Sequence, residues 1–130
     1  MRTVQVTGLL IVALTAWGCG EPCNDASAAS DVRGSFGVTV DNMSGACDTV
    51  TLPSTVRYEA LVGVQVDGCS GGSSGFSATC RLDANRTCDD GGTFVLDVLF
   101  DSDLDRADGM MVRADASGAE CVADVTLDRL

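Results

Sequence analysis

The chain of 130 residues contains no histidine and no lysine, so all eight of its basic residues are arginines. Without histidine it lacks the usual general base near neutral pH and the commonest nitrogen ligand for metals. Without lysine it cannot form a Schiff base with a carbonyl substrate. Catalysis would have to use carboxylates, a thiol, a hydroxyl group or a bound metal. We therefore expect a protein that is not an enzyme and that carries no cofactor.

Positive charge is scarce as well. Nineteen acidic residues against eight arginines give a formal net charge of −11. Nucleic-acid backbones are bound by clustered Lys and Arg side chains, so no nucleic-acid partner is expected. The same negative charge disfavours electrostatic docking on anionic lipid, and a link to a membrane would have to be covalent.

The sequence also lacks an apolar run long enough to span a bilayer, which takes about 20 residues. Its longest apolar run extends from Val4 to Trp17, roughly 14 residues, and follows the basic residue Arg2. A basic start followed by an apolar stretch of this length is typical of a cleavable export signal, which we expect to be helical.

The end of this run, Ala16-Trp17-Gly18-Cys19, resembles the lipobox of bacterial lipoproteins. In that family the cysteine is acylated with diacylglycerol and the chain is cut just before it, so the resemblance implies lipidation of Cys19. Gly18 and Cys19 match the pattern, whereas Ala16 stands where the family usually has Leu and Trp17 where it has a small residue. Ala16-Trp17-Gly18 would also suit an ordinary signal peptidase, and this alternative stays open.

The residue after the cysteine bears on the expected location. An aspartate there would resemble the signal that retains lipoproteins in the inner membrane, and this chain has Gly20 instead. The resemblance therefore implies an outer-membrane lipoprotein of the bacterial cell envelope, on its periplasmic or its surface face.

The number of cysteines agrees with lipidation. The seven cysteines are Cys19, Cys23, Cys47, Cys69, Cys80, Cys88 and Cys121. An odd number in an exported chain leaves one thiol unexplained. If Cys19 carries lipid, six remain for three disulfide bonds. Six cysteines allow fifteen pairings. Chain topology favours Cys23–Cys69, Cys47–Cys121 and Cys80–Cys88 among them.

The remaining chain is expected to form one β domain. Residues 1–18 are interpreted as the signal peptide, residues 19–34 as the lipidated cysteine and a tether, and residues 35–130 as the domain. Apolar and polar residues alternate with the period of two that is typical of half-buried strands. The expected strands are residues 35–40, 49–52, 56–66, 76–82, 93–100, 109–115 and 120–130. Short polar turns between them, including 41–46, 68–75 and 83–92, predict a small antiparallel meander that closes as a barrel or a two-sheet sandwich.

Two motifs resemble known sites. Residues 71–75 spell G-x-S-x-G, but a nucleophile elbow needs a strand-to-helix turn and a histidine, so we interpret them as a turn. The acidic stretch 101–108 resembles the first half of an EF-hand calcium loop, with Asp101, Asp103, Asp105 and Asp108 as candidate ligands. Arg106 stands where that family has Gly, and Val112 where it has the bidentate Glu. We therefore favour a solvated acidic hairpin loop, which binds calcium weakly at most, over a calcium site.

These observations favour a lipid-anchored, exported, non-enzymatic β domain with a structural or protein-interaction role. A calcium-dependent adhesion or binding module built on residues 101–108 is one alternative. A hydrolase that uses two carboxylates is another. The sequence names no particular partner beyond the membrane and the cell envelope.

Overall fold

The computed structural model describes residues 32–77 and 79–130. These residues form an all-β fold, which confirms the predicted fold class. The strands are β1 (Gly34–Gly45), β2 (Thr55–Glu59), β3 (Gly63–Gln65), β4 (Cys69–Phe76), β5 (Arg81–Cys88), β6 (Thr93–Phe100), β7 (Arg106–Ala114) and β8 (Glu120–Arg129). The predicted signal helix lies outside the described residues. Within them, no helix has the length and apolar character needed to cross a membrane.

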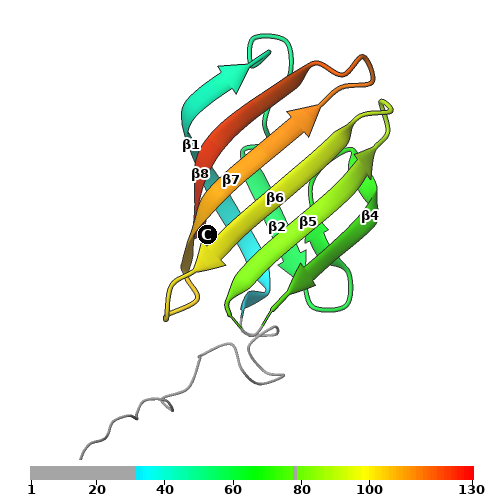
Figure 1. Ribbon diagram of the computed structural model, residues 1–130. Helices are drawn as coiled ribbons and strands as arrows, with labels where there is room; N and C mark the ends of the chain where they lie inside the picture. The colour runs from blue at the N-terminus through cyan, green and yellow to red at the C-terminus, as the bar shows by residue number, and fades with distance from the viewer. Residues whose placement is uncertain (1–31, 78) are drawn as a thin grey trace, which may run out of the picture.

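All the strands belong to one sheet with the order β3-β2-β1-β8-β7-β6-β5-β4. Every pair of neighbours is antiparallel, and β1 pairs with β8 over most of its length. The two edge strands, β3 and β4, lie against each other, so the sheet curls into a nearly closed barrel (Figure 1). The expected meander thus closes as a barrel rather than as a two-sheet sandwich.

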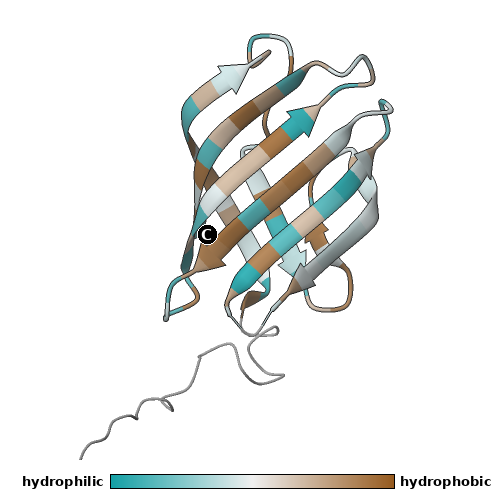
Figure 2. Cartoon of the chain, viewed as in Figure 1, coloured by the Kyte–Doolittle hydropathy of each residue, from teal (hydrophilic) through white to brown (hydrophobic). Residues whose placement is uncertain are grey.

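Alternate residues of the strands are buried in the barrel interior. Figure 2 shows hydrophobic and hydrophilic residues following one another along several of these strands. The buried positions are Leu82, Ala84, Arg86 and Cys88 in β5, and Phe94, Leu96, Val98 and Phe100 in β6. Burying one Val, Leu or Phe side chain contributes about 1.5–3 kcal/mol. The packed interior holds the sheet in its curled form.

The barrel has two unlike ends, which we name for what they carry. The entry end, lower in Figure 1, holds Gly34, the β2–β3 turn (60–62), the β6–β7 turn (101–105) and Leu130. The cleft end, upper in Figure 1, holds the start of the loop 46–54 and the turns 66–68, 89–92 and 115–119.

Aromatic side chains fill the interior at the entry end. Phe100 packs against Phe36 and Phe76, with ring centroids 5.4 Å and 6.1 Å away, and Phe76 lies 6.1 Å from Tyr58. Each of these residues stands near the end of its strand that faces the entry end. Only one other phenylalanine, Phe94, is present, and it stands at the cleft end. Three of the four phenylalanines and the only tyrosine of the chain are thus gathered at the entry end.

The prediction of one continuous strand over residues 56–66 is wrong, because these residues form the β2–β3 hairpin. The turn at residues 60–62 is closed by a hydrogen bond from Val62 N to Glu59 O of 3.1 Å. Gly63, the first residue of β3, has φ of 87°, a backbone conformation that side-chain-bearing residues rarely adopt and that reverses the chain after the turn. Tyr58 and Val64 remain buried as the alternation predicted, since they pair across the hairpin.

The expected turn 68–75 is also wrong, because these residues form most of β4. The expected connection 83–92 is wrong as well, because residues 83–88 belong to β5. The turn that joins β4 to β5 lies within the expected strand 76–82. β4 reads Cys-Ser-Gly-Gly-Ser-Ser-Gly-Phe, which has the composition of a turn. Its small residues are needed for close packing, since a Cβ at Gly72 would collide with the backbone of Asn85.

Three smaller differences concern the start of the fold. β1 runs on to Gly45 through a bulge between Asp41 and Ser44, where a turn over 41–46 was expected. Residues 49–52 form no strand, although Val50 is buried. Val32 is fully buried in the core, so the last residues of the expected tether belong to the folded domain.

Candidate functional site

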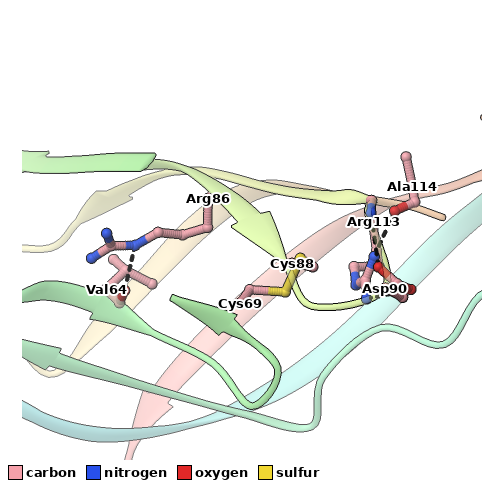
Figure 3. The surroundings of a disulfide bond; sticks show 8 residues. Val64, Cys69, Arg86, Cys88, Asp90, Arg113 and Ala114 are labelled. Carbon is pink, nitrogen blue, oxygen red and sulfur yellow. Dashed lines mark hydrogen bonds and ion pairs between the residues drawn. A yellow bond between two sulfur atoms is a disulfide. The ribbon is translucent and has the colours of Figure 1, made fainter. Parts of the chain in front are cut away.

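A disulfide bond between Cys69 and Cys88 joins β4 to β5 at the cleft end (Figure 3). The two residues are direct cross-strand partners and both are buried. The expected pairings Cys23–Cys69 and Cys80–Cys88 are therefore wrong. The cause is the misplaced strands, because the sequence pattern put Cys88 in a loop and Cys80 within a strand.

The expected Cys47–Cys121 bond is present. It ties the chain just after β1 to the second residue of β8, as the pairing of the first and last strands predicts. Cys80, in the β4–β5 turn with φ of 65°, is disulfide-bonded as well. Cys19, the predicted lipidation site, and Cys23 lie outside the described residues.

A cleft of about 410 Å³ lies at the cleft end, beside the second half of the loop 46–54. It is lined by Thr51, Leu52, Pro53, Ser54, Thr55, Val66, Asp67, Cys69, Phe94 and Arg113. Leu52, Pro53 and Val66 contribute apolar groups to the lining. Hydroxyl groups, one carboxylate and one guanidinium make the larger share of the exposed lining polar. A cleft of this composition can orient a partner through several hydrogen bonds and a smaller apolar contact.

Arg113 occupies the last inward position of β7 and is held in place from one side. Its Nη2 lies 3.0 Å from Oδ2 of Asp90, and its Nη1 donates to the carbonyl oxygen of Ala114 (Figure 3). The other carboxylate oxygen of Asp90 accepts a hydrogen bond of 2.8 Å from Gly92 N. The Gly92 amide first, and then Arg113, lower the pKa of Asp90 below its ordinary value. The carboxylate form of Asp90 is therefore favoured.

Arg86 closes the gap between the edge strands beneath the cleft. Its side chain extends from β5 past β4, where Nε donates to Val64 O at 2.9 Å and Nη2 to Val62 O at 2.7 Å (Figure 3). The Oγ of Ser74 accepts from Val64 N at 3.0 Å and donates to Asp83 O at 2.9 Å. These side chains replace the backbone ladder that two paired strands would form, and we call this junction the seam.

The structure does not gather the four aspartates of the predicted calcium loop. Asp105 pairs with Arg129 Nε at 2.9 Å, and Asp101 Oδ1 accepts from Asp105 N at 3.4 Å. Asp108 stands on the outer wall of the barrel, where it accepts from Thr126 Oγ1 at 2.7 Å. Asp103 is exposed on the turn. Over residues 32–77 and 79–130, no group of three or more acidic or cysteine side chains is placed to hold a metal ion.

No family model matches this chain. The comparisons with curated proteins and with solved structures likewise found no match. The site is therefore assessed from its own geometry.

Sequence reasoning missed Arg86, Arg113 and Asp90 as organising residues. A signal for Arg86 was present, because it continues the inward alternation of Leu82 and Ala84 at a position where a charged residue is unusual. Arg113 likewise follows Met111 on the inward face of β7. Asp90 had no comparable signal, since its role depends on the turn that places it beside β7.

Proposed function

We propose that this chain is an exported, lipid-anchored, non-enzymatic β-barrel domain that binds a protein or cell-envelope partner at its cleft end. One observation carries the proposal. The chain enters the fold at one end of the barrel, at Val32 and Gly34, and the cleft lies at the other end.

This arrangement suits a protein held by its N-terminus. A lipid on Cys19 would place the entry end toward the membrane, and the cleft would face away from it. β6 has eight residues, and strands rise about 3.3 Å per residue and tilt in a barrel, so the two ends are roughly 20 Å apart. The cleft would be presented clear of the lipid headgroups.

The chemistry of the cleft supports binding rather than hydrolysis. A carboxylate-based hydrolase needs two acids on opposite sides of its substrate. Within the described part of the chain, Asp67 is the single carboxylate that lines the cleft. Arg113 is already neutralised by Asp90. The remaining polar groups, the hydroxyls of Thr51, Ser54 and Thr55, are suited to hydrogen bonding with a partner.

The anchoring part of the proposal is tested by Cys19→Ser in the full chain. The wild-type protein is expected in the membrane fraction after high-salt washing and at the density of the outer membrane. The variant is expected in the soluble fraction. A Cys19→Ser protein that still pellets with washed membranes would show that no lipid on Cys19 holds it.

The binding part is tested with a photo-crosslinking residue in the lipidated protein in intact cells. Positions 51 and 67 lie in the cleft, and Asp83 on the outward face of β5 serves as the control. We expect a discrete crosslinked product from the two cleft positions and none from position 83. Equal crosslinking from all three positions would contradict a binding role for the cleft.

A further inference from the structure

The turn of the β2–β3 hairpin exposes two large apolar side chains at the entry end. Leu61 is 100% exposed and Val62 is 58% exposed. Polar residues, glycine and proline dominate such turns because they suit the backbone and the solvent. This turn reads Ala60-Leu61-Val62, and it forms a hydrophobic loop in Figure 2. We call these three residues the tip.

The tip stands on a well-braced base. Arg57 Nη2 donates to Gln65 Oε1 at 2.9 Å across the hairpin. Val62 N donates to Glu59 O, and Val62 O accepts from the buried Arg86. The backbone on both sides of Leu61 is therefore fixed, while its side chain is left uncovered by the described residues. An apolar group held in this way is preorganised for contact with something outside the domain.

The position of the tip indicates what it contacts. It lies at the entry end, where Val32 and Gly34 begin the fold. Residues 19–31 connect Cys19 to the described chain. Thirteen residues span at most about 45 Å even when fully extended. An anchor at Cys19 would thus hold the tip within reach of the bilayer surface.

We propose that the tip inserts Leu61 and Val62 into the interfacial region of a bilayer with neutral headgroups, and so fixes the barrel with its cleft outward. This inference rests on the proposed lipid anchor, because two apolar side chains bind a membrane poorly unless the anchor raises their local concentration.

The charged side chains at the entry end indicate which lipid headgroups the tip can approach. The β6–β7 turn, at the same end of the barrel, carries Asp101, Asp103 and Asp105, of which Asp105 is paired with Arg129. The exposed Asp103 would be repelled by anionic headgroups. The apolar tip, in contrast, needs only access to acyl chains. Neutral, zwitterionic lipid is therefore the expected partner.

Leu61→Trp provides a direct test. The only tryptophan of the chain is Trp17, which leaves with the signal peptide, so the new residue would be the sole indole. The lipidated variant is placed on phosphatidylcholine vesicles with and without brominated acyl chains. Ala116→Trp, at an exposed turn of the cleft end, is the matched control. The emission of the indole at position 61 is expected to shift to the blue on vesicles and to be quenched at least twofold more strongly than that of the indole at position 116.

A measurement on the unsubstituted protein complements this test. Hydrogen exchange of the amides of residues 60–62 should slow at least threefold when the lipidated protein is on phosphatidylcholine vesicles. Leu61→Ser should remove the slowing without releasing the protein from the vesicles. Replacing a third of the lipid with phosphatidylglycerol should weaken both signals at low salt, and strengthening would contradict the apolar mode of contact.

The outcomes separate the two proposals. If Cys19→Ser releases the protein but the indole of Leu61→Trp is quenched no more than that of Ala116→Trp, the membrane contact of the tip is wrong and the anchor stands. If Cys19→Ser does not release it, the anchor is wrong. A blue shift in Leu61→Trp that occurs without vesicles and grows with protein concentration would show that the tip pairs with a second copy instead.

Discussion

The guanidinium group of Arg86 donates hydrogen bonds to both sides of the seam. Arg86 is only 6% exposed, and its hydrogen bonds go to carbonyl oxygens of the β2–β3 hairpin and of β4. A buried guanidinium is costly unless its donors are satisfied. Here the fixed fork of five N–H groups joins the edge strands β3 and β4, which are not neighbours in the hydrogen-bonded order of the sheet.

Replacing this side chain should open the seam. In Arg86→Met the carbonyls of Val62 and Val64 lose their donors, and each unsatisfied buried acceptor costs about 1–3 kcal/mol. We expect a loss of about 2–4 kcal/mol in the free energy of unfolding, measured in urea. Arg57→Met, which removes an exposed hydrogen bond of the same hairpin, is the control and should cost less than about 0.5 kcal/mol. Equal losses would show that the seam contributes nothing specific.

A second prediction at the scale of residues concerns pH. Arg81 donates through Nε at 2.8 Å and through Nη2 to the two oxygens of Asp97, and this lowers the pKa of Asp97. A carboxyl whose pKa is lowered by folding stabilises the fold above its unfolded pKa of about 4, and that contribution is lost as the pH falls through the folded value.

Asp97→Asn should therefore melt slightly below the wild type at pH 7, and the difference in Tm should shrink as the pH falls below about 4 and through the folded pKa of Asp97. The effect is expected to be small because both side chains are substantially exposed. Thermal unfolding followed by circular dichroism from neutral to acid pH measures it. A difference in Tm that stays constant as the pH falls would indicate a packing effect rather than lost charge pairing.

At the scale of elements, β6 and β8 were predicted nearly to the residue, because every inward position of β6 and each one from Cys121 to Leu127 of β8 is apolar. β4 could not be predicted, since a strand of glycine and serine carries no alternation and is defined only by its pairing with β5. The turn between β2 and β3 could not be predicted for the opposite reason. The apolar residues continue through Ala60 and Val62, and only the conformation of Gly63 interrupts them.

The candidate site shows the same limits. Cys47 and Cys121 were brought together correctly because the pairing of β1 with β8 follows from a closed meander. Cys69 and Cys88 were not, because their pairing depends on the unpredicted strand β4. The cleft depends on where the loop 46–54 passes, and no local pattern in the sequence determines that.

The two described disulfides should differ in their contribution to stability. Their sequence separations are 74 residues for Cys47–Cys121 and 19 for Cys69–Cys88. Loop-closure entropy assigns them about 4 and about 3 kcal/mol. Removing each pair by Cys→Ala, with guanidinium unfolding as the measurement, should cost more for Cys47–Cys121. The reverse order would indicate that packing of the buried Cys69 and Cys88 sulfurs outweighs chain entropy.

Peptide mapping without reduction should also locate the partner of Cys80. The other four cysteines of the described residues are bonded to one another, and lipid on Cys19 would leave Cys23 for Cys80. We expect a Cys23–Cys80 peptide and an intact mass about 6 Da below that of the reduced protein, since each bond removes two hydrogens. A Cys19–Cys80 peptide would contradict lipidation.

At the scale of the whole molecule, the excess of negative charge opposes the compact state. Outward carboxylates such as Asp41 and Asp124 even stand directly across from each other on β1 and β8. Such pairs are destabilising, and salt screens them. The barrel therefore folds against its own electrostatic repulsion, with core burial and disulfides supplying the stability.

Salt should accordingly raise the melting temperature. Between about 0.01 M and 0.15 M ionic strength the screening length falls from about 30 Å to about 8 Å. We expect Tm to rise by about 2–6 °C with NaCl, and CaCl₂ at matched ionic strength to do no more. A larger rise with calcium that is lost in Asp103→Asn would establish a specific calcium site in the 101–105 turn.

The hydrogen bond of 3.0 Å from Leu130 N to Ser35 O has a practical consequence for anyone who labels this protein. It places the last residue of the sequence beside the start of β1, at the entry end. A fluorescent protein or affinity tag fused there would sit against the start of β1, and with a lipid on Cys19, as proposed, it would come between the barrel and the bilayer. An epitope inserted in the exposed turn 116–118 would stand at the opposite end of the barrel, where antibodies could reach it without contacting the entry end.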